Sequence, residues 1–115
     1  FEANENVDHG DIYLQDYIKL SNLDLINELR KKQAQITIKL CQKFVFCFPS
    51  ILNQSRVQNG NETFYPRRTP KDSNLDINKS IRSQFNLLRT VDNIHYPAFF
   101  KYKGKKFILK IEKED

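Results

Sequence analysis

Hydrophobic and polar positions in the first half of the chain predict one strand followed by one long helix. Apolar and polar residues alternate from Ile12 to Leu20, which is the period of a half-buried strand. Ser21 and Asp24 then have the spacing of a capping box, and apolar side chains from Leu25 to Phe44 recur at helical intervals. Because proline cannot continue a helix, Pro49 ends this element at about residue 48.

The second half of the chain opens with a polar segment and continues into a shorter helix. Residues 50–63 are rich in Asn, Gln, Ser and Gly, which is typical of a loop. Residues 64–70 contain two prolines and are expected to be extended. Apolar spacing predicts a second helix over residues 78–91, with Asp76 or Asn78 as its N-cap.

The pattern of the last residues, from Phe99 to Ile111, predicts a β-hairpin. Two alternating runs, Phe99–Tyr102 and Lys106–Ile111, flank the turn signal Lys103-Gly104-Lys105. The second run divides its side chains between two faces: Phe107, Leu109 and Ile111 on one, Ile108 and Lys110 on the other. An isolated hairpin is marginal in water. We therefore expect this hairpin to pack on the rest of the chain, on a second copy, or on both.

The composition fits a mixed α/β chain, α+β when taken as an isolated piece. The 115 residues suffice for one domain or part of one, and the first residue, Phe1, indicates a processed product or an excised fragment. The apolar runs are too short to cross a bilayer, so we expect no membrane association and a cytoplasmic location. Cys41 and Cys47 are expected to be buried apolar fillers, and no metal site is expected because the two Cys and two His are scattered.

The formal charge of +5 is concentrated in the second half of the chain. Residues 1–64 carry 7 basic and 8 acidic side chains, whereas residues 65–115 carry 12 basic and 6 acidic ones. Such a basic region attracts phosphorylated ligands or nucleic acid, and it is equally typical of a solvated lysine-rich hairpin.

One short motif carries candidate chemistry. In Val7-Asp8-His9-Gly10-Asp11-Ile12, an acid and a glycine stand on a tight loop just before the expected strand. Catalytic groups often occupy such loops at the edge of a rigid scaffold. The alternative is a simple Asx-type turn in which Gly10 supplies a positive φ.

This motif and two later ones together resemble the formyltransferase superfamily. The other segments are Thr63–Ser73 with Leu75-Asp76, and Asn86–Arg89 followed by Tyr96–Phe99. The order and spacing match over nearly the whole chain. The resemblance implies the C-terminal part of a Rossmann-like formyltransferase domain, most similar to the bacterial sugar N-formyltransferases of surface-glycan and lipopolysaccharide synthesis.

The resemblance also implies an organisation and an activity. Residues 1–50 would be the end of the catalytic domain, residues 51–97 an extended linker and short helix on the acceptor side, and residues 98–115 a dimerising hairpin. The enzyme would transfer a formyl group from 10-formyltetrahydrofolate to the amine of a nucleotide-linked amino sugar. Asp8 would be its catalytic residue and Gly10 would shape the loop.

The family places an Asn-x-His pair before the catalytic Asp, and here no such pair precedes Asp8. Asn93-Ile94-His95 repeats the letters in the wrong place, and we interpret it as coincidence, with His95 a turn or surface residue. The 115-residue chain is therefore expected to be inactive alone, because the half that binds the formyl donor lies outside it.

Four residues are candidates for binding the acceptor: Tyr65, Arg67, Arg68 and Arg89. Arginine forks match phosphate oxygens, and a tyrosine ring stacks on a sugar or base. The alternatives are a solvated loop for Arg67 and Arg68, a favourable helix-end charge for Arg89, and a core position for Tyr65.

Two other functions remain open. The chain could be a basic nucleic-acid-binding module, or a fragment of a methionyl-tRNA formyltransferase. We expect no specific nucleic-acid partner, because the lysines alternate along a hairpin and are not gathered on a recognition helix.

Overall fold

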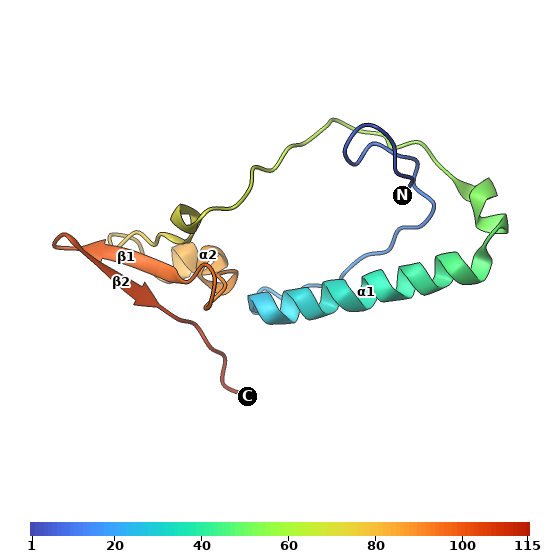
Figure 1. Cartoon of the computed structure of the whole chain (residues 1–115). Helices are drawn as coiled ribbons and strands as arrows, with labels where there is room; N and C mark the ends of the chain where they lie inside the picture. Colours follow the sequence, from blue (N-terminus) through green and yellow to red (C-terminus); the bar gives the residue numbers. More distant parts are fainter. The chain divides into compact units, whose positions relative to one another are not determined.

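The computed structural model describes all of residues 1–115 and shows a mixed α/β chain, as predicted (Figure 1). Its elements, in order, are α1 (Ile26–Cys47), three short 3-10 turns (Ser50–Gln54, Pro70–Ser73 and Arg82–Gln84), α2 (Phe85–Arg89), β1 (Ala98–Tyr102) and β2 (Lys105–Leu109). The chain forms two compact units. Unit 1 comprises residues 1–19 and 31–64, and unit 2 comprises residues 20–30 and 65–115.

The long helix α1 confirms the clearest prediction from the sequence. Its 22 residues end at Cys47, just before Pro49. The predicted capping pair bonds, because the backbone N–H of Ser21 donates to the Asp24 carboxylate at 2.7 Å, but it does not open the helix, which begins at Ile26. This turn precedes the helix, and Glu28 caps the helix itself by accepting a hydrogen bond from the backbone N–H of Leu25 at 2.8 Å.

The terminal hairpin is also confirmed. Strands β1 and β2 pair antiparallel, with Ala98 opposite Leu109 and Tyr102 opposite Lys105. Lys103 and Gly104 form the turn with φ of 46° and 74°, as a two-residue hairpin turn of the I′ kind requires. One face of the hairpin packs on the core of unit 2, which comprises Leu75, Leu88, Val91 and Ala98, with Leu87, Phe100, Leu109 and Ile111 against them.

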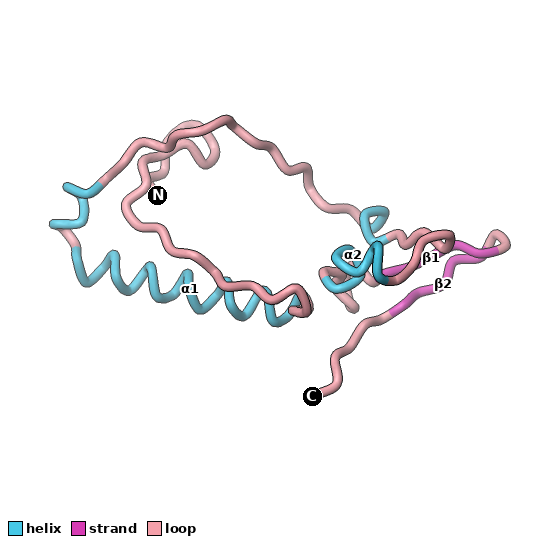
Figure 2. Tube along the Cα trace, turned by 180° about the vertical axis from the view of Figure 1, so that it is seen from behind, coloured by secondary structure: helices cyan, strands magenta, loops and turns pink.

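The predicted strand over residues 12–20 is wrong. These residues form a loop, and Figure 2 shows no strand before α1. An extended segment becomes a strand only when a neighbour completes its hydrogen-bond ladder. Here the segment makes a single antiparallel bridge, between Ile12 and Arg56.

The predicted second helix is largely wrong as well. The structure has a 3-10 turn over Arg82–Gln84 and a helix of only 5 residues, Phe85–Arg89. The proposed cap Asp76 instead forms an Asx turn, accepting a hydrogen bond from the backbone N–H of Asn78 at 2.9 Å. The Gln84 side chain bonds both backbone groups of Asp76, at 2.9 and 3.0 Å. Such side-chain bonds to the backbone compete with helix formation.

Unit 1 has little buried apolar surface. Ile51 is 1% exposed, and the rings of Tyr13 and Phe44 meet edge to face at 5.8 Å. No residue of α1 is buried. The prediction of two buried cysteines is therefore wrong: Cys41 is exposed and Cys47 is half-buried. Neither helix has the length and hydropathy needed to cross a membrane.

Candidate functional site

The motif residue Asp8 lies in unit 1 on an exposed loop with an unusual backbone conformation. Its φ is 58°, in the left-handed region that residues other than glycine rarely adopt. Asp tolerates this region better than most side chains, at a cost on the order of 1 kcal/mol. Backbone outliers of this kind concentrate at functional sites. The structure therefore presents the Asp8 carboxylate to solvent from a strained position.

Position 10 has no room for a side chain, so it requires glycine. The expectation that Gly10 supplies a positive φ is wrong, because the residue in the left-handed conformation is Asp8. Gly10 is buried beside the backbone of Glu2. A Cβ at position 10 would lie 1.6 Å from the carbonyl oxygen of Glu2, so no larger residue fits without moving the backbone. Gly10 thus shapes the loop by allowing two backbone segments to touch.

Backbone hydrogen bonds hold the C-terminal end of this loop. The N–H of Glu2 donates to the carbonyl of Asp11 at 2.8 Å. Ile12 and Arg56 exchange two backbone bonds, at 2.8 and 3.0 Å. The Asp8 loop is therefore anchored to two distant parts of the sequence, the N-terminal residues and the segment around residue 56.

All four expected acceptor-binding residues lie in unit 2, where Tyr65 is 86% exposed. Arg67 and Arg68 line an open depression of about 450 Å³ together with Thr69, Asp72, Leu87 and Thr90. The Arg68 guanidinium donates to the Ser73 hydroxyl at 3.2 Å and to the Thr90 carbonyl at 3.4 Å. Both arginines remain at the surface, where an anion has access to them.

Arg89 has a different environment at the end of α2. Its guanidinium donates to the backbone carbonyls of Ser21 at 3.3 Å and Asp24 at 3.0 Å, and to the Asn86 side chain at 2.8 Å. These bonds tie α2 to the segment that precedes α1. Arg89 is therefore engaged within the protein, and its contact with a substrate stays a prediction.

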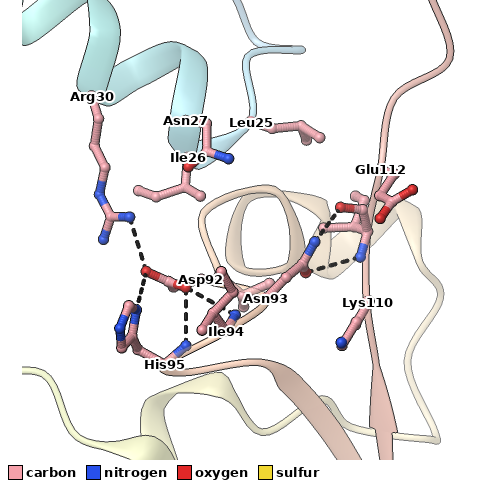
Figure 3. A pocket seen from close by; sticks show the side chains of 12 residues that line it. Leu25, Ile26, Asn27, Arg30, Asp92, Asn93, Ile94, His95, Lys110 and Glu112 are labelled. Atoms are coloured by element: carbon pink, nitrogen blue, oxygen red, sulfur yellow. Dashed lines mark hydrogen bonds and ion pairs between the residues drawn. The ribbon is translucent and has the colours of Figure 1, made fainter.

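Unit 2 also contains a cavity of about 350 Å³ where the first turn of α1 meets residues 91–95 and 110–112 (Figure 3). Its central group is Asp92, which is 9% exposed. One carboxylate oxygen accepts the backbone N–H groups of Ile94 and His95 at 2.9 and 3.0 Å. The other oxygen faces the Arg30 guanidinium at 2.9 Å and the His95 ring at 3.2 Å.

These donors hold the pKa of Asp92 well below its ordinary value. The largest cause is the backbone N–H of His95, followed by that of Ile94 and then by the Arg30 guanidinium. All of them stabilise the ionised carboxylate. Asp92 is therefore a charged group that organises the 91–95 turn.

We expect Asp92→Asn to lower the thermal unfolding midpoint at pH 7. Because the folded-state pKa is depressed, the contribution of Asp92 is complete above its unfolded pKa of about 3.9 and is lost as the pH falls toward the folded value. The difference between wild type and variant should thus be constant from pH 7 to pH 5 and shrink below about pH 4. Thermal melts followed by circular dichroism measure it, with the exposed Glu114→Gln as control. A difference unchanged at pH 3 would contradict this account.

The structure also accounts for Asn93 and His95. The Asn93 side chain donates to the Ile111 carbonyl at 2.7 Å and accepts its N–H at 3.1 Å, like a paired strand residue. It fastens the chain after β2 to the turn before β1. His95 is an exposed turn residue beside Asp92, with its side chain 72% exposed. This geometry supports the interpretation of Asn93-Ile94-His95 as a chance repeat of the family letters.

No pattern in the sequence indicates the pair of Arg30 and Asp92. The two residues are 62 positions apart, and each is an ordinary charged residue in its local context. Asp8 and Gly10 belong to unit 1, and Tyr65, Arg67, Arg68 and Arg89 belong to unit 2. The structure contains no group of three or more His, Cys, Asp or Glu residues placed to hold a metal ion.

Comparisons with known proteins agree with the resemblance seen in the motifs. The chain is 26% identical over 106 residues to the bifunctional polymyxin resistance protein ArnA of Wigglesworthia glossinidia brevipalpis, covering 91% of this chain and 16% of that protein. It is 27% identical over 111 residues to the methionyl-tRNA formyltransferase of Mycoplasma capricolum, covering 90% of this chain and 35% of that protein. No family model and no solved structure matches.

The chain is therefore formyltransferase-like over most of its length. It spans well under half of both curated relatives. The similarity supports the resemblance to formyltransferases in the three motifs, and the activity and substrates of the whole protein are left to proposal.

Proposed function

We propose that this chain is the C-terminal part of an N-formyltransferase that transfers a formyl group from 10-formyltetrahydrofolate to the amine of a nucleotide-linked amino sugar in the cytoplasm. The observation that carries the proposal is the Asp8 loop. It combines the family motif with a left-handed aspartate and a glycine that accepts no side chain. Similarity to a methionyl-tRNA formyltransferase over 90% of the chain supports the formyl-transfer part of the proposal.

The chemistry gives Asp8 a defined task. The neutral amine attacks the formyl carbon, a C–N bond forms, and the bond to the folate nitrogen breaks. The amine loses one proton and the departing folate nitrogen gains one. Asp8 would accept the amine proton or orient a histidine that does so, as a carboxylate beside an imidazole does in other acyl transfers. The Asn-x-His pair implied by the family resemblance would supply the oxyanion contact.

The surface around residue 65 supports a nucleotide-linked acceptor. Tyr65 exposes its ring, and Arg67 and Arg68 are accessible beside it. An exposed aromatic ring and arginine forks are the groups that bind a base and its phosphates. Mass spectrometry of amino-sugar nucleotides, incubated with the formyl donor and the protein translated from the complete reading frame that encodes residues 1–115, tests the proposal. An N-formylated product is the expected result.

The second candidate function is binding of nucleic acid, either as a separate module or as part of an enzyme that acts on transfer RNA. The hairpin favours it, because residues 98–110 contain five lysines and no acid. Tyr102 and Phe107 are each about half exposed among these lysines. Such a surface binds single strands weakly and loses affinity steeply with salt. Affinity that survives moderate salt would favour this candidate.

We further propose that the chain forms a homodimer through the hairpin. Ile108 and Phe107 are 62% and 47% exposed, and burying each such side chain contributes about 1.5–3 kcal/mol. We expect sedimentation to show a dimer for the wild type and a folded monomer for Ile108→Asp. Ile81→Asp, at a site 55% exposed outside the hairpin, should remain dimeric. A wild-type monomer at high micromolar concentration would contradict the proposal.

A further inference from the structure

Gln58 spans the loop that carries Asp8. Its side-chain nitrogen Nε2 donates to the carbonyl of Asp8 at 2.8 Å and to the carbonyl of Gly10 at 2.6 Å. An amide nitrogen carries two N–H groups, so both can be used at once. One side chain thus holds the carbonyls on either side of His9, although it lies about fifty positions away in the sequence.

Gln58 is itself held in place by the backbone next to it. Arg56 exchanges two backbone bonds with Ile12, which fixes the segment beside the loop. In an extended segment, residues 56 and 58 share one face. The Arg56 guanidinium also donates a hydrogen bond to the side-chain oxygen of Gln15. The side chains of Arg56 and Gln58, which lie on the same face of their segment, therefore both bond to residues between Asp8 and Gln15.

The loop needs an external support of this kind. Asp8 has a φ of 58°, which costs free energy unless neighbouring contacts impose it. The carbonyl of Gly10 belongs to a buried residue, and a buried acceptor without a donor is costly. The backbone bonds made with Glu2 and Arg56 hold Asp11 and Ile12, which follow Gly10 in the sequence. The carbonyl of Asp8 accepts its hydrogen bond from Gln58.

We propose that Gln58 is a positioning residue that fixes the direction of the Asp8 carboxylate by clamping its loop. The inference rests on the proposed function, in which Asp8 takes part in proton transfer. Gln58 has no chemical role of its own: it supplies two N–H donors at a fixed place. A misplacement of about 1 Å in a reacting group lowers turnover by about 10²-fold.

Three variants distinguish the effect of the N–H donors of Gln58 from the effect of its side-chain shape. Gln58→Glu keeps the shape and removes both N–H donors, whereas Gln58→Lys keeps N–H donors at the end of a slightly longer side chain. Gln42→Glu makes the matched change at an exposed glutamine of α1. The assay uses the protein translated from the complete reading frame that encodes residues 1–115, with 10-formyltetrahydrofolate and an amino-sugar nucleotide.

For Gln58→Glu we expect kcat to fall about 10²-fold with KM nearly unchanged, because substrate binding does not depend on the carboxylate direction. Gln58→Lys should recover most of the loss, and Gln42→Glu should match the wild type. Amide hydrogen exchange in the 115-residue chain should show loss of protection at the amides of Glu2, Ile12 and Arg56, whose hydrogen bonds close the loop, in Gln58→Glu and not in Gln42→Glu.

Asp8→Asn, assayed in parallel, separates two kinds of failure. If Asp8→Asn abolishes turnover while Gln58→Glu leaves kcat and loop protection unchanged, the positioning role is wrong and the proposed function stands. If Asp8→Asn has no effect, or the wild type forms no product, the proposed function is wrong, and exchange at the amides of Glu2, Ile12 and Arg56 still decides whether Gln58 holds the loop.

Discussion

Replacement of Asp8 by asparagine is expected to lower kcat for formyl transfer by about 10²–10⁴-fold, the range for loss of a positioned acid–base group. Asparagine has nearly the same size and tolerates the left-handed conformation at position 8, where φ is 58°. It carries no negative charge and accepts no proton, so the fold should survive while proton transfer fails. Steady-state kinetics of the protein from the complete reading frame measure the loss.

The matched control for this variant is Asp11→Asn, three residues along the same loop. Asp11 takes part in the loop through its backbone carbonyl, which accepts the N–H of Glu2, and this bond survives the substitution. We expect Asp11→Asn to retain activity within a few-fold of the wild type. Equal losses in the two variants would mean that general loop charge matters, and the specific role of Asp8 would be wrong.

Replacement of Leu88 by alanine is expected to cost about 2–5 kcal/mol of the free energy of unfolding of unit 2, the range for a large-to-small change in a packed core. Leu88 is 5% exposed and packs with Leu75, Val91 and Ala98. Alanine leaves a cavity where α2 meets the hairpin, and this small core has few other contacts to compensate. Urea denaturation followed by the signals of unit 2 residues in NMR spectra measures the change.

Ile81→Ala provides the control for this prediction. Ile81 is 55% exposed and precedes the 3-10 turn of Arg82–Gln84, so its truncation removes little buried surface. We expect a loss below about 1 kcal/mol. A loss at Leu88 no larger than that at Ile81 would show that the core of unit 2 is not its main source of stability.

The sequence correctly predicted the elements that are formed by residues close together in the chain. Helix α1 follows from apolar spacing that ends at Pro49, and the hairpin follows from alternation around Gly104. The strand expected before α1 depends on a partner strand, which a periodic pattern does not reveal. The expected second helix failed because the Asp76 side chain bonds the backbone of Asn78 and the Gln84 side chain bonds the backbone of Asp76 and Lys79. The strand therefore failed for lack of a partner, and the helix failed because side chains bonded the backbone.

In the candidate site too, features set by neighbouring residues were predicted, and features set by distant residues were not. The position of Asp8 on a loop followed from the motif, because an acid and a glycine before an apolar run are a local signal. The left-handed φ at Asp8, the contact of Gly10 with Glu2, and the clamp by Gln58 all depend on residues brought together by folding. Asp92 and Arg30 form their pair in the same way.

The most direct test of the central claim is a formyl-transfer assay on the protein translated from the complete reading frame that encodes residues 1–115. The protein is incubated with 10-formyltetrahydrofolate and a panel of nucleotide-linked amino sugars, with methionyl-tRNA as a separate acceptor. Our account predicts a mass increase of one carbonyl group on the amine of an amino sugar, and formation of this product about 10²–10⁴-fold more slowly in Asp8→Asn. Absence of a formylated amino sugar, together with nucleic-acid binding that survives moderate salt, would contradict it.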